Sequence, residues 1–230
     1  MNSDELTERV RELRMKGCSP KEIARALGVQ PATVATIVRV VAAADEGNAN
    51  GTVKCWVSPG WSTGLLVDRP DWPDVDTASS TGSGLANVLV AREEKGTKVS
   101  VCGYLVDVFC LGVKDIIGPR MMNRSAVPEL SAAFFSAYRA RPLVIPLELA
   151  QHLVLGAVEF ARDLGFAPAA GFDAIRGYLE PWTGPSAIRF GLQGKPFFIQ
   201  GPYDNAARIH RTLERSVGDG NFHFTGVPVR

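Results

Sequence analysis

The chain of 230 residues has few of the residues that build metal sites and disulfide frameworks. It contains four cysteines and three histidines, with no Cys-x-x-Cys pair and no two histidines at zinc-finger spacing. These absences argue against a structural zinc site, and we expect free, reduced thiols. No stretch approaches the ~20 apolar residues that span a bilayer, and the N-terminus lacks the basic and apolar regions of a signal peptide. We therefore expect a cytoplasmic protein with no membrane contact.

Sequence signatures of common enzymes are missing as well. There is no Gly-x-x-x-x-Gly-Lys-Ser/Thr phosphate loop, no Gly-x-Gly-x-x-Gly after a strand and no Gly-x-Ser-x-Gly elbow. Hydrophobic residues make up 46% and charged residues 21%, which is typical of a globular protein. The net charge of +1 divides into +2 for residues 1–44, −3 for residues 45–104 and +2 for residues 105–230. No segment is basic enough to establish nucleic-acid binding from charge alone, and no cofactor is expected.

The first forty-four residues carry a run of helix signals. Apolar positions at helical spacing predict a helix over residues 6–16. Residues 19–22 place Ser at an N-cap, Pro at the first helical position and Glu three residues after the cap, which predicts a second helix. A tight turn at residues 28–30 then leads into a third predicted helix, which covers residues 31–41. Three short helices with this spacing predict a helix-turn-helix domain over residues 1–44.

The sequence of residues 19–34, Ser-Pro-Lys-Glu-Ile-Ala-Arg-Ala-Leu-Gly-Val-Gln-Pro-Ala-Thr-Val, resembles the helix-turn-helix of resolvases, transposases and sigma-factor region 4. This resemblance implies that the third helix enters the major groove of DNA. The side chains placed to contact phosphates or base edges are Lys21, Arg25, Gln30, Thr33, Thr36 and Arg39. Because only one of the base-reading positions is cationic, we expect either a homodimer on DNA or a second contact surface. A three-helix module for protein contacts is the alternative.

Small and turn-forming residues at positions 45–52 predict a linker, so residues 53–230 form a second, larger domain. Its strand and helix patterns predict an α+β fold with antiparallel hairpins and a long core helix. Strands are predicted at residues 53–57, 85–92, 98–109, 143–145, 188–191 and 195–200. Residues 85–92 and 98–109 are predicted to form one hairpin, and residues 188–191 and 195–200 a second one. Helices are predicted at residues 128–138, 146–164 and 206–217.

An acidic segment at residues 68–84 contains several Pro and Gly residues, and it predicts a mobile loop that does not pack. Four aspartates in it suggest a calcium site. The spacing lacks the Gly at the sixth position and the distal Glu of a helix-loop-helix calcium site, so a solvated loop is favoured.

Three pieces of the larger domain resemble an uncharacterised bacterial domain family. They are Gly-Tyr-Leu-Val-Asp-Val-Phe-Cys-Leu-Gly-Val-Lys-Asp at residues 103–115, Glu-Leu-Ala-Gln-His-Leu-Val-Leu-Gly-Ala-Val-Glu-Phe-Ala at 148–161 and Gly-Lys-Pro-Phe-Phe-Ile-Gln-Gly-Pro-Tyr-Asp-Asn at 194–205. The resemblance covers most of residues 53–224 and implies a discrete domain, without implying an activity.

Candidate catalytic residues cluster in two places in the larger domain. Residues 99–115 form the most continuous β-branched and aromatic run, which predicts a strand covered on both faces, and Asp107 is a carboxylate within it. Glu148, His152 and Glu159 recur on one face of the predicted long helix. If Asp107, Lys114, His152 and Glu159 converge, they could run acid–base or metal-assisted hydrolysis of a phosphodiester, the only case in which a divalent metal is expected.

Each of these features also has a structural explanation. Asp107 could pair with Lys114 inside the core, the long helix could simply present a solvated polar face, and Cys110 could be an inert core thiol. The helix at residues 206–217 is the most cationic of the chain, and it could be a solvated face or a surface for anions or nucleic acid.

The leading hypothesis from the sequence is a bacterial-type DNA-binding regulator. Its helix-turn-helix would be joined to an α+β domain for dimerisation, ligand sensing or partner contact. A nucleic-acid-processing hydrolase targeted by the helix-turn-helix is the second hypothesis, and a protein-interaction adaptor without nucleic acid is the third.

Overall fold

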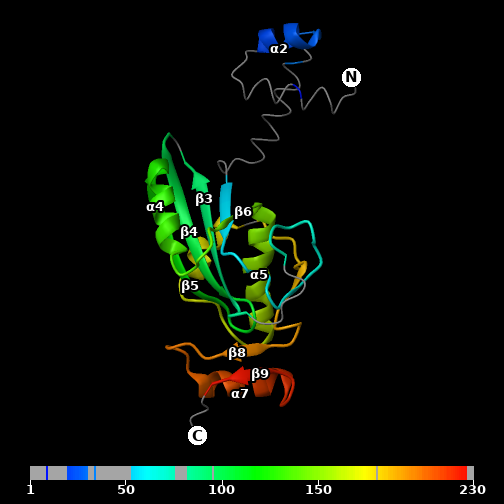
Figure 1. The fold of residues 1–230 in the computed structure, drawn as a ribbon, viewed down its shortest axis with the longest axis vertical. Helices are drawn as coiled ribbons and strands as arrows, with labels where there is room; N and C mark the ends of the chain where they lie inside the picture. The colour runs from blue at the N-terminus through cyan, green and yellow to red at the C-terminus, as the bar shows by residue number, and fades with distance from the viewer. Residues whose placement is uncertain are drawn as a thin grey trace. The chain divides into compact units, whose positions relative to one another are not determined.

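The computed structural model describes residues 9, 20–30, 34, 53–75, 82–94, 96–179 and 181–226 (Figure 1). Contacts within the chain divide it into two units, Met1–Thr52 and Val53–Arg230. In the first unit, Pro20–Leu27 forms helix α2, as the sequence predicts. The predicted first and third helices, the Ser19 cap and the linker lie outside the described residues, apart from Arg9 and Val34, which are helical.

The end of α2 has the expected turn. Gly28 adopts a left-handed backbone with φ of 64°, which a residue without Cβ reaches at little cost. The Val29 N–H donates to the Ala24 carbonyl at 3.1 Å, which closes the helix end. Ile23, Ala24 and Val34 are buried. The turn after the second helix is therefore confirmed, whereas the arrangement of three helices stays a prediction.

The second unit is built on a five-stranded antiparallel sheet with the order β5-β4-β3-β1-β6. The strands are β1 (Val53–Val57), β3 (Leu85–Glu93), β4 (Lys98–Asp107), β5 (Gly112–Asn123) and β6 (Leu143–Ile145). The predicted hairpin of β3 and β4 is confirmed, with Val90 opposite Cys102. The α+β class of the larger domain is likewise confirmed.

One helix covers each face of the sheet (Figure 1). Helix α4 (Val127–Phe134) packs on the face that carries Val99 and Val101 of β4. Helix α5 (Leu147–Asp163) packs on the opposite face, where Cys102 and Tyr104 point. Because successive side chains of a strand point to opposite faces, β4 is buried on both sides, as its apolar run predicts. The predicted long helix matches α5.

Glycine permits the close approach of α5 to the turn between β4 and β5. Gly112 has φ of 67°, and a Cβ there would lie 2.8 Å from both the Ala157 carbonyl oxygen and the Ala161 Cβ. A larger residue would push α5 away from the sheet.

The C-terminal part of the unit forms a smaller cluster beyond the end of α5. It consists of β8 (Phe197–Ile199), helix α7 (Ala206–Val217) and β9 (His223–Thr225), and β8 pairs with β9 in parallel. Phe198, Ile209 and Leu213 form its buried centre together with Leu164 at the end of α5. Helix α7 spans the predicted residues 206–217.

Three predictions need correction. The single covered strand predicted over residues 99–115 is wrong: a turn at residues 108–111 separates β4 from β5. No strand is predicted for residues 116–123, because an edge strand lacks the apolar pattern of a buried one. The predicted hairpin of residues 188–191 and 195–200 is wrong: β7 (Ile188–Arg189) pairs with β2 (Leu66–Val67), and β8 pairs with β9. Partners distant in sequence replace the local pairing.

The acidic segment, which the structure describes at residues 68–75 and 82–84, is packed in its first part. Trp72 is only 4% exposed, and the Asp74 side chain accepts the Gly60 N–H at 2.7 Å. The expectation of an unpacked loop is therefore wrong for residues 68–75, because a buried indole anchors them. The short helix α6 (Phe172–Ile175) continues into a 3₁₀ turn at Arg176–Tyr178.

Candidate functional site

Asp107 lies at the end of β4, where it organises the turn into β5. Its Oδ1 accepts the N–H groups of Phe109 at 3.0 Å and Cys110 at 2.9 Å, and the residue is 5% exposed. Burial raises the pKa of Asp107 to about 6, against the opposing effects of the Lys114 charge and the backbone donors. Cys110 is buried, and burial together with the Asp107 charge raises its thiol pKa. A thiol of this kind is inert.

Lys114 on β5 forms its ion pair with another carboxylate. Its Nζ lies 2.7 Å from Asp204 Oδ2, and the two side chains are 21% and 13% exposed. The same Asp204 oxygen accepts the Gly201 N–H at 2.8 Å. The pair therefore ties the loop before α7 to the sheet, and the expected pairing of Lys114 with Asp107 is limited to their electrostatic interaction.

His152 on α5 is enclosed by aromatic rings. Its ring centroid lies 5.2 Å from that of Trp72 and 4.9 Å from that of Trp182. Its Nδ1 accepts the Ala187 N–H at 2.8 Å, which requires an unprotonated Nδ1. Burial lowers the pKa of His152, the Glu148 charge raises it, and the Arg69 charge lowers it further. The imidazole thus holds residues 182–187 against α5.

The two carboxylates on the same face of α5 also have partners. Glu148 accepts a hydrogen bond from Arg69 at 2.8 Å, and Glu159 accepts one from Trp182 Nε1 at 2.8 Å. Arg69 also lies over the Trp72 ring, 5.2 Å from its centroid. This face of α5 is therefore a docking surface for two loops of the same chain.

The four candidate catalytic residues are thus engaged in two separate sets of contacts. His152 and Glu159 both accept hydrogen bonds from the segment of residues 182–187. Asp107 and Lys114 make their contacts in the β4–β5 region and with the loop before α7. Within the described part of the chain, no group of three or more His, Cys, Asp and Glu side chains could hold a metal ion. The contacts seen for all four stabilise the fold.

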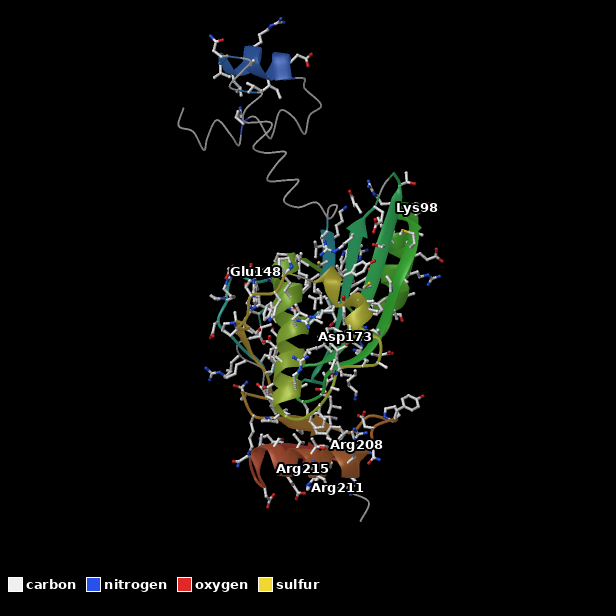
Figure 2. All side chains as sticks on the ribbon, turned by 180° about the vertical axis from the view of Figure 1, so that it is seen from behind. Lys98, Glu148, Asp173, Arg208, Arg211 and Arg215 are labelled. Atoms are coloured by element: carbon white, nitrogen blue, oxygen red, sulfur yellow. The ribbon has the colours of Figure 1, made fainter. Side chains whose placement is uncertain are left out.

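The row of Arg208, Arg211 and Arg215 on α7 differs from these residues. Their spacing places them on one face of the helix, opposite the buried Ile209 and Leu213, and all three are exposed (Figure 2). Their guanidinium groups make no hydrogen bond or ion pair with any described residue. We call these three residues the arginine row.

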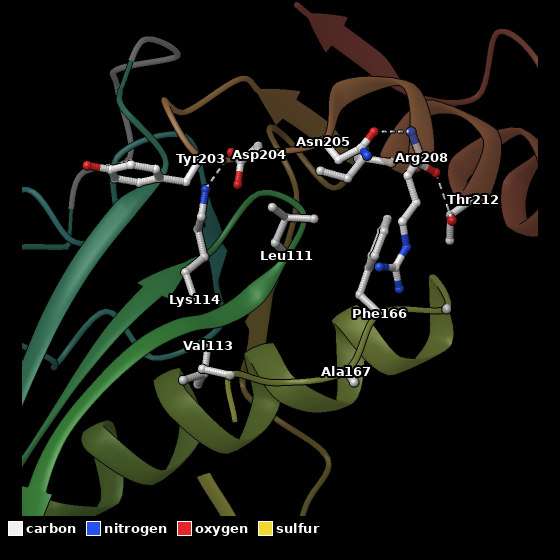
Figure 3. A pocket seen from close by; sticks show the side chains of 13 residues that line it. Leu111, Val113, Lys114, Phe166, Ala167, Tyr203, Asp204, Asn205, Arg208 and Thr212 are labelled. Carbon is white, nitrogen blue, oxygen red and sulfur yellow. Dashed lines mark hydrogen bonds and ion pairs between the residues drawn. The ribbon is translucent and has the colours of Figure 1, made fainter. Parts of the chain in front are cut away.

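Two hollows open beside the arginine row. One, of about 460 Å³, lies between the loop before α7 and residues 165–169, and Figure 3 shows Lys114 and Arg208 on opposite sides of it. The other, of about 570 Å³, lies between the end of α5 and the outer side of α7. The second hollow is lined by Leu164, Gly165, Arg208, Arg211, Thr212, Arg215 and Ser216, with no carboxylate among them.

The DNA-contacting residues predicted in the first unit are partly described. Arg25 and Gln30 are exposed. The side chain of Lys21 and the whole of Thr33, Thr36 and Arg39 lie outside the described residues. No helix in the described residues is long and apolar enough to cross a membrane.

Comparisons with protein-family models, with curated proteins and with solved structures find no match to this chain. The two resemblances drawn from the sequence therefore stay predictions.

Proposed function

We propose that the protein is a nucleic-acid-binding regulator in which the arginine row contacts the phosphate backbone. Neutralising phosphates with cationic side chains releases counterions, and this release supplies much of the affinity of DNA-binding proteins. The observation that carries the proposal is that Arg208, Arg211 and Arg215 share one exposed helix face without any acidic partner among the described residues.

The neighbouring charges on α7 support the same reading. Glu214, the only carboxylate of the helix, makes no ion pair with the arginine row and lies 3.4 Å from His210 Nδ1, which is an ion pair only when that imidazole is protonated. A surface that serves solubility alone usually mixes charges of both signs. The arginine row has one sign, and the second hollow beside it contains no competing carboxylate.

The first unit fits the proposal through its sequence. Its resemblance to helix-turn-helix proteins implies a DNA-recognition helix, and the sequence of that helix carries little positive charge. The exposed Arg25 on α2 adds one cation. Such a helix needs further phosphate contacts for useful affinity. The arginine row is a candidate for those contacts, with the larger unit also serving dimerisation, sensing or partner contact.

The direct test measures binding of the full chain to fluorescein-labelled duplex and single-stranded DNA by anisotropy, between about 50 and 300 mM NaCl. Replacing all three arginines of the row by Gln should weaken binding at least tenfold at the lowest salt. It should also reduce the slope of log K against log salt by about 3, because each lost phosphate contact removes roughly one counterion.

The matched control replaces Arg120, Arg139 and Arg141 by Gln. These arginines are also exposed, their guanidinium groups make no hydrogen bond or ion pair with a described residue, and the net charge changes equally. We expect less than a twofold effect on affinity. Equal weakening in both variants would mean that only net charge matters, and absent binding by the unaltered chain would remove the proposal.

A further inference from the structure

Tyr203 is the most exposed large hydrophobic side chain among the described residues. The residue as a whole is 98% exposed, compared with 71% for Val144 and 60% for Met121. A tyrosine usually buries its ring and exposes only its hydroxyl. A ring that is wholly in water therefore calls for an explanation.

The loop that carries Tyr203 is fixed on both sides of the ring. Asp204 accepts the Gly201 N–H at 2.8 Å and pairs with Lys114 at 2.7 Å. Asn205 caps α7 by accepting the Arg208 N–H at 3.0 Å. The ring is thus exposed on a well-anchored turn, and anchoring of this kind lowers the entropy that a ligand must overcome on binding.

Tyr203 lies at the rim of the hollow from which the arginine row begins. Figure 3 shows Tyr203 and Arg208 on opposite sides of the hollow, with Leu111 between them, and the Tyr203 ring extends away from it into solvent. From Arg208 to Arg215 the helix rises about 10 Å. An aromatic face, a hollow lined by both apolar and charged residues, and a row of cations thus follow one another along this surface.

We propose that this surface binds single-stranded nucleic acid, with a base stacked on Tyr203 and the adjoining phosphates on the arginine row. Single-strand binders combine a cationic track with aromatic rings on which bases stack. In a duplex, the faces of the bases are covered by their neighbours, so a protruding ring has nothing to stack on. This inference rests on the proposed nucleic-acid binding and specifies the strand form at the arginine row alone, which would contact a single strand beside the duplex that a helix-turn-helix reads.

The experiment measures how tightly the whole 230-residue chain binds each of two single strands that carry equal charge. One is an oligothymidylate of about 12 nucleotides, within the usual range of single-strand site sizes, and the other is the same backbone with abasic sites throughout. We expect the unaltered chain to prefer the oligothymidylate by about tenfold, the effect of stacking one base. Tyr203→Leu should reduce this preference to less than twofold, and Tyr203→Phe should retain it.

Two further variants separate the possible failures. Met121→Ala, which removes another exposed apolar side chain, should leave the preference unchanged. Replacing the arginine row by Gln should weaken binding of both strands equally. If Tyr203→Leu keeps the tenfold preference while the arginine variant weakens binding, the stacking inference is wrong and the proposed function stands. If the arginine variant binds both strands as tightly as the unaltered chain, the proposed function itself is wrong.

Discussion

Helices α5 and α7 both carry charged side chains on an outward face, but the arginine row of α7, unlike Glu148, His152 and Glu159 of α5, has no partner among the described residues. Glu148, His152 and Glu159 on α5 bind Arg69, the Ala187 N–H and Trp182. The arginine row on α7 binds no described residue. The face of α5 thus holds the fold together, whereas the face of α7 is available to a ligand.

The comparison shows why residue type is a poor guide to function in this chain. A histidine between two carboxylates has the composition of a catalytic site, yet each group here meets a loop that returns from elsewhere in the sequence. The arginines have the composition of an ordinary solvated face. Their lack of partners among the residues that the structure describes is visible only once the other segments are in place, and it makes stability and binding separable properties.

The largest expected effect on stability is at Trp72, which packs against His152 on the outward face of α5. This indole is 4% exposed and packs against Trp61 and His152. Trp72→Ala should lower the free energy of unfolding by about 3–5 kcal/mol, the usual cost of deleting a buried tryptophan. Tryptophan fluorescence in a urea titration measures it, because all four tryptophans lie in residues 53–230.

Trp72→Phe is the control for that change. The Trp72 Nε1 is buried and has no hydrogen-bond partner among the described residues, so the smaller ring loses contacts but also removes an unsatisfied donor. A loss as large as that of the alanine variant would show that the indole nitrogen has a partner.

The next effect extends the comparison to Asp107, whose contacts are also structural. Asp107→Ala leaves the buried N–H groups of Phe109 and Cys110 without an acceptor and should cost about 2–4 kcal/mol. Asp107→Asn retains an accepting oxygen and should fold with far less loss. If the asparagine variant were as unstable as the alanine variant, acceptance of these hydrogen bonds would not be the main role of the side chain.

Comparing the unaltered chain with Asp107→Asn also gives a pH dependence of stability whose sign follows from the pKa of Asp107. The folded protein holds the Asp107 proton more tightly than the unfolded chain, since the pKa rises from 3.8 to about 6. The contribution of Asp107 to the free energy of unfolding is therefore fully present below pH 3.8 and is lost as the pH rises to about 6. The stability of Asp107→Asn relative to the unaltered chain should therefore increase as the pH rises over this range, by an amount on the order of 3 kcal/mol.

His152 should produce the opposite slope. The pKa of His152 is lowered in the folded protein. The contribution of His152 to stability is therefore fully present above the ordinary pKa of 6.5 and is lost as the pH falls through the lowered pKa. At pH 8, His152→Ala should cost about 1–2 kcal/mol because the Ala187 N–H loses its acceptor.

His152→Asn separates the two contributions of the imidazole, since its amide oxygen can accept the same N–H without titrating. Urea titrations at pH 8 and pH 5 should show a smaller acid loss for the asparagine variant than for the unaltered chain. Equal losses would exclude His152 as the titrating group.

Much of the larger unit could be predicted from sequence because its signals are local. The apolar run of β4, the turn after β3 and the long stripe of α5 each specify their own element. β5 and the pairings of β7 and β8 could not be predicted, since an edge strand has little apolar pattern and short strands take whichever partner the tertiary fold supplies.

The candidate site was harder to predict for a related reason. The spacing of the arginine row could be seen in the sequence, but its lack of an ion pair with any described carboxylate depends on where the acidic side chains lie. Tyr203 gave no signal beyond a Gly-Pro-Tyr-Asp-Asn turn. Its exposure follows from Asp204 binding Lys114, a residue ninety positions earlier in the chain.

The smallest effect on stability tests the comparison most directly, with one side chain from each helix. Arg211→Ala should change the free energy of unfolding by no more than about 0.5 kcal/mol, as expected for a surface residue without partners. Glu159→Ala removes the acceptor of Trp182 Nε1 and should cost about 1 kcal/mol. For nucleic acid the order reverses: Arg211→Ala should lower the salt slope by about 1, and Glu159→Ala should leave it unchanged. If Arg211→Ala proved as destabilising as Glu159→Ala, the arginine row would be a structural face like that of α5, and its availability to phosphates would no longer follow.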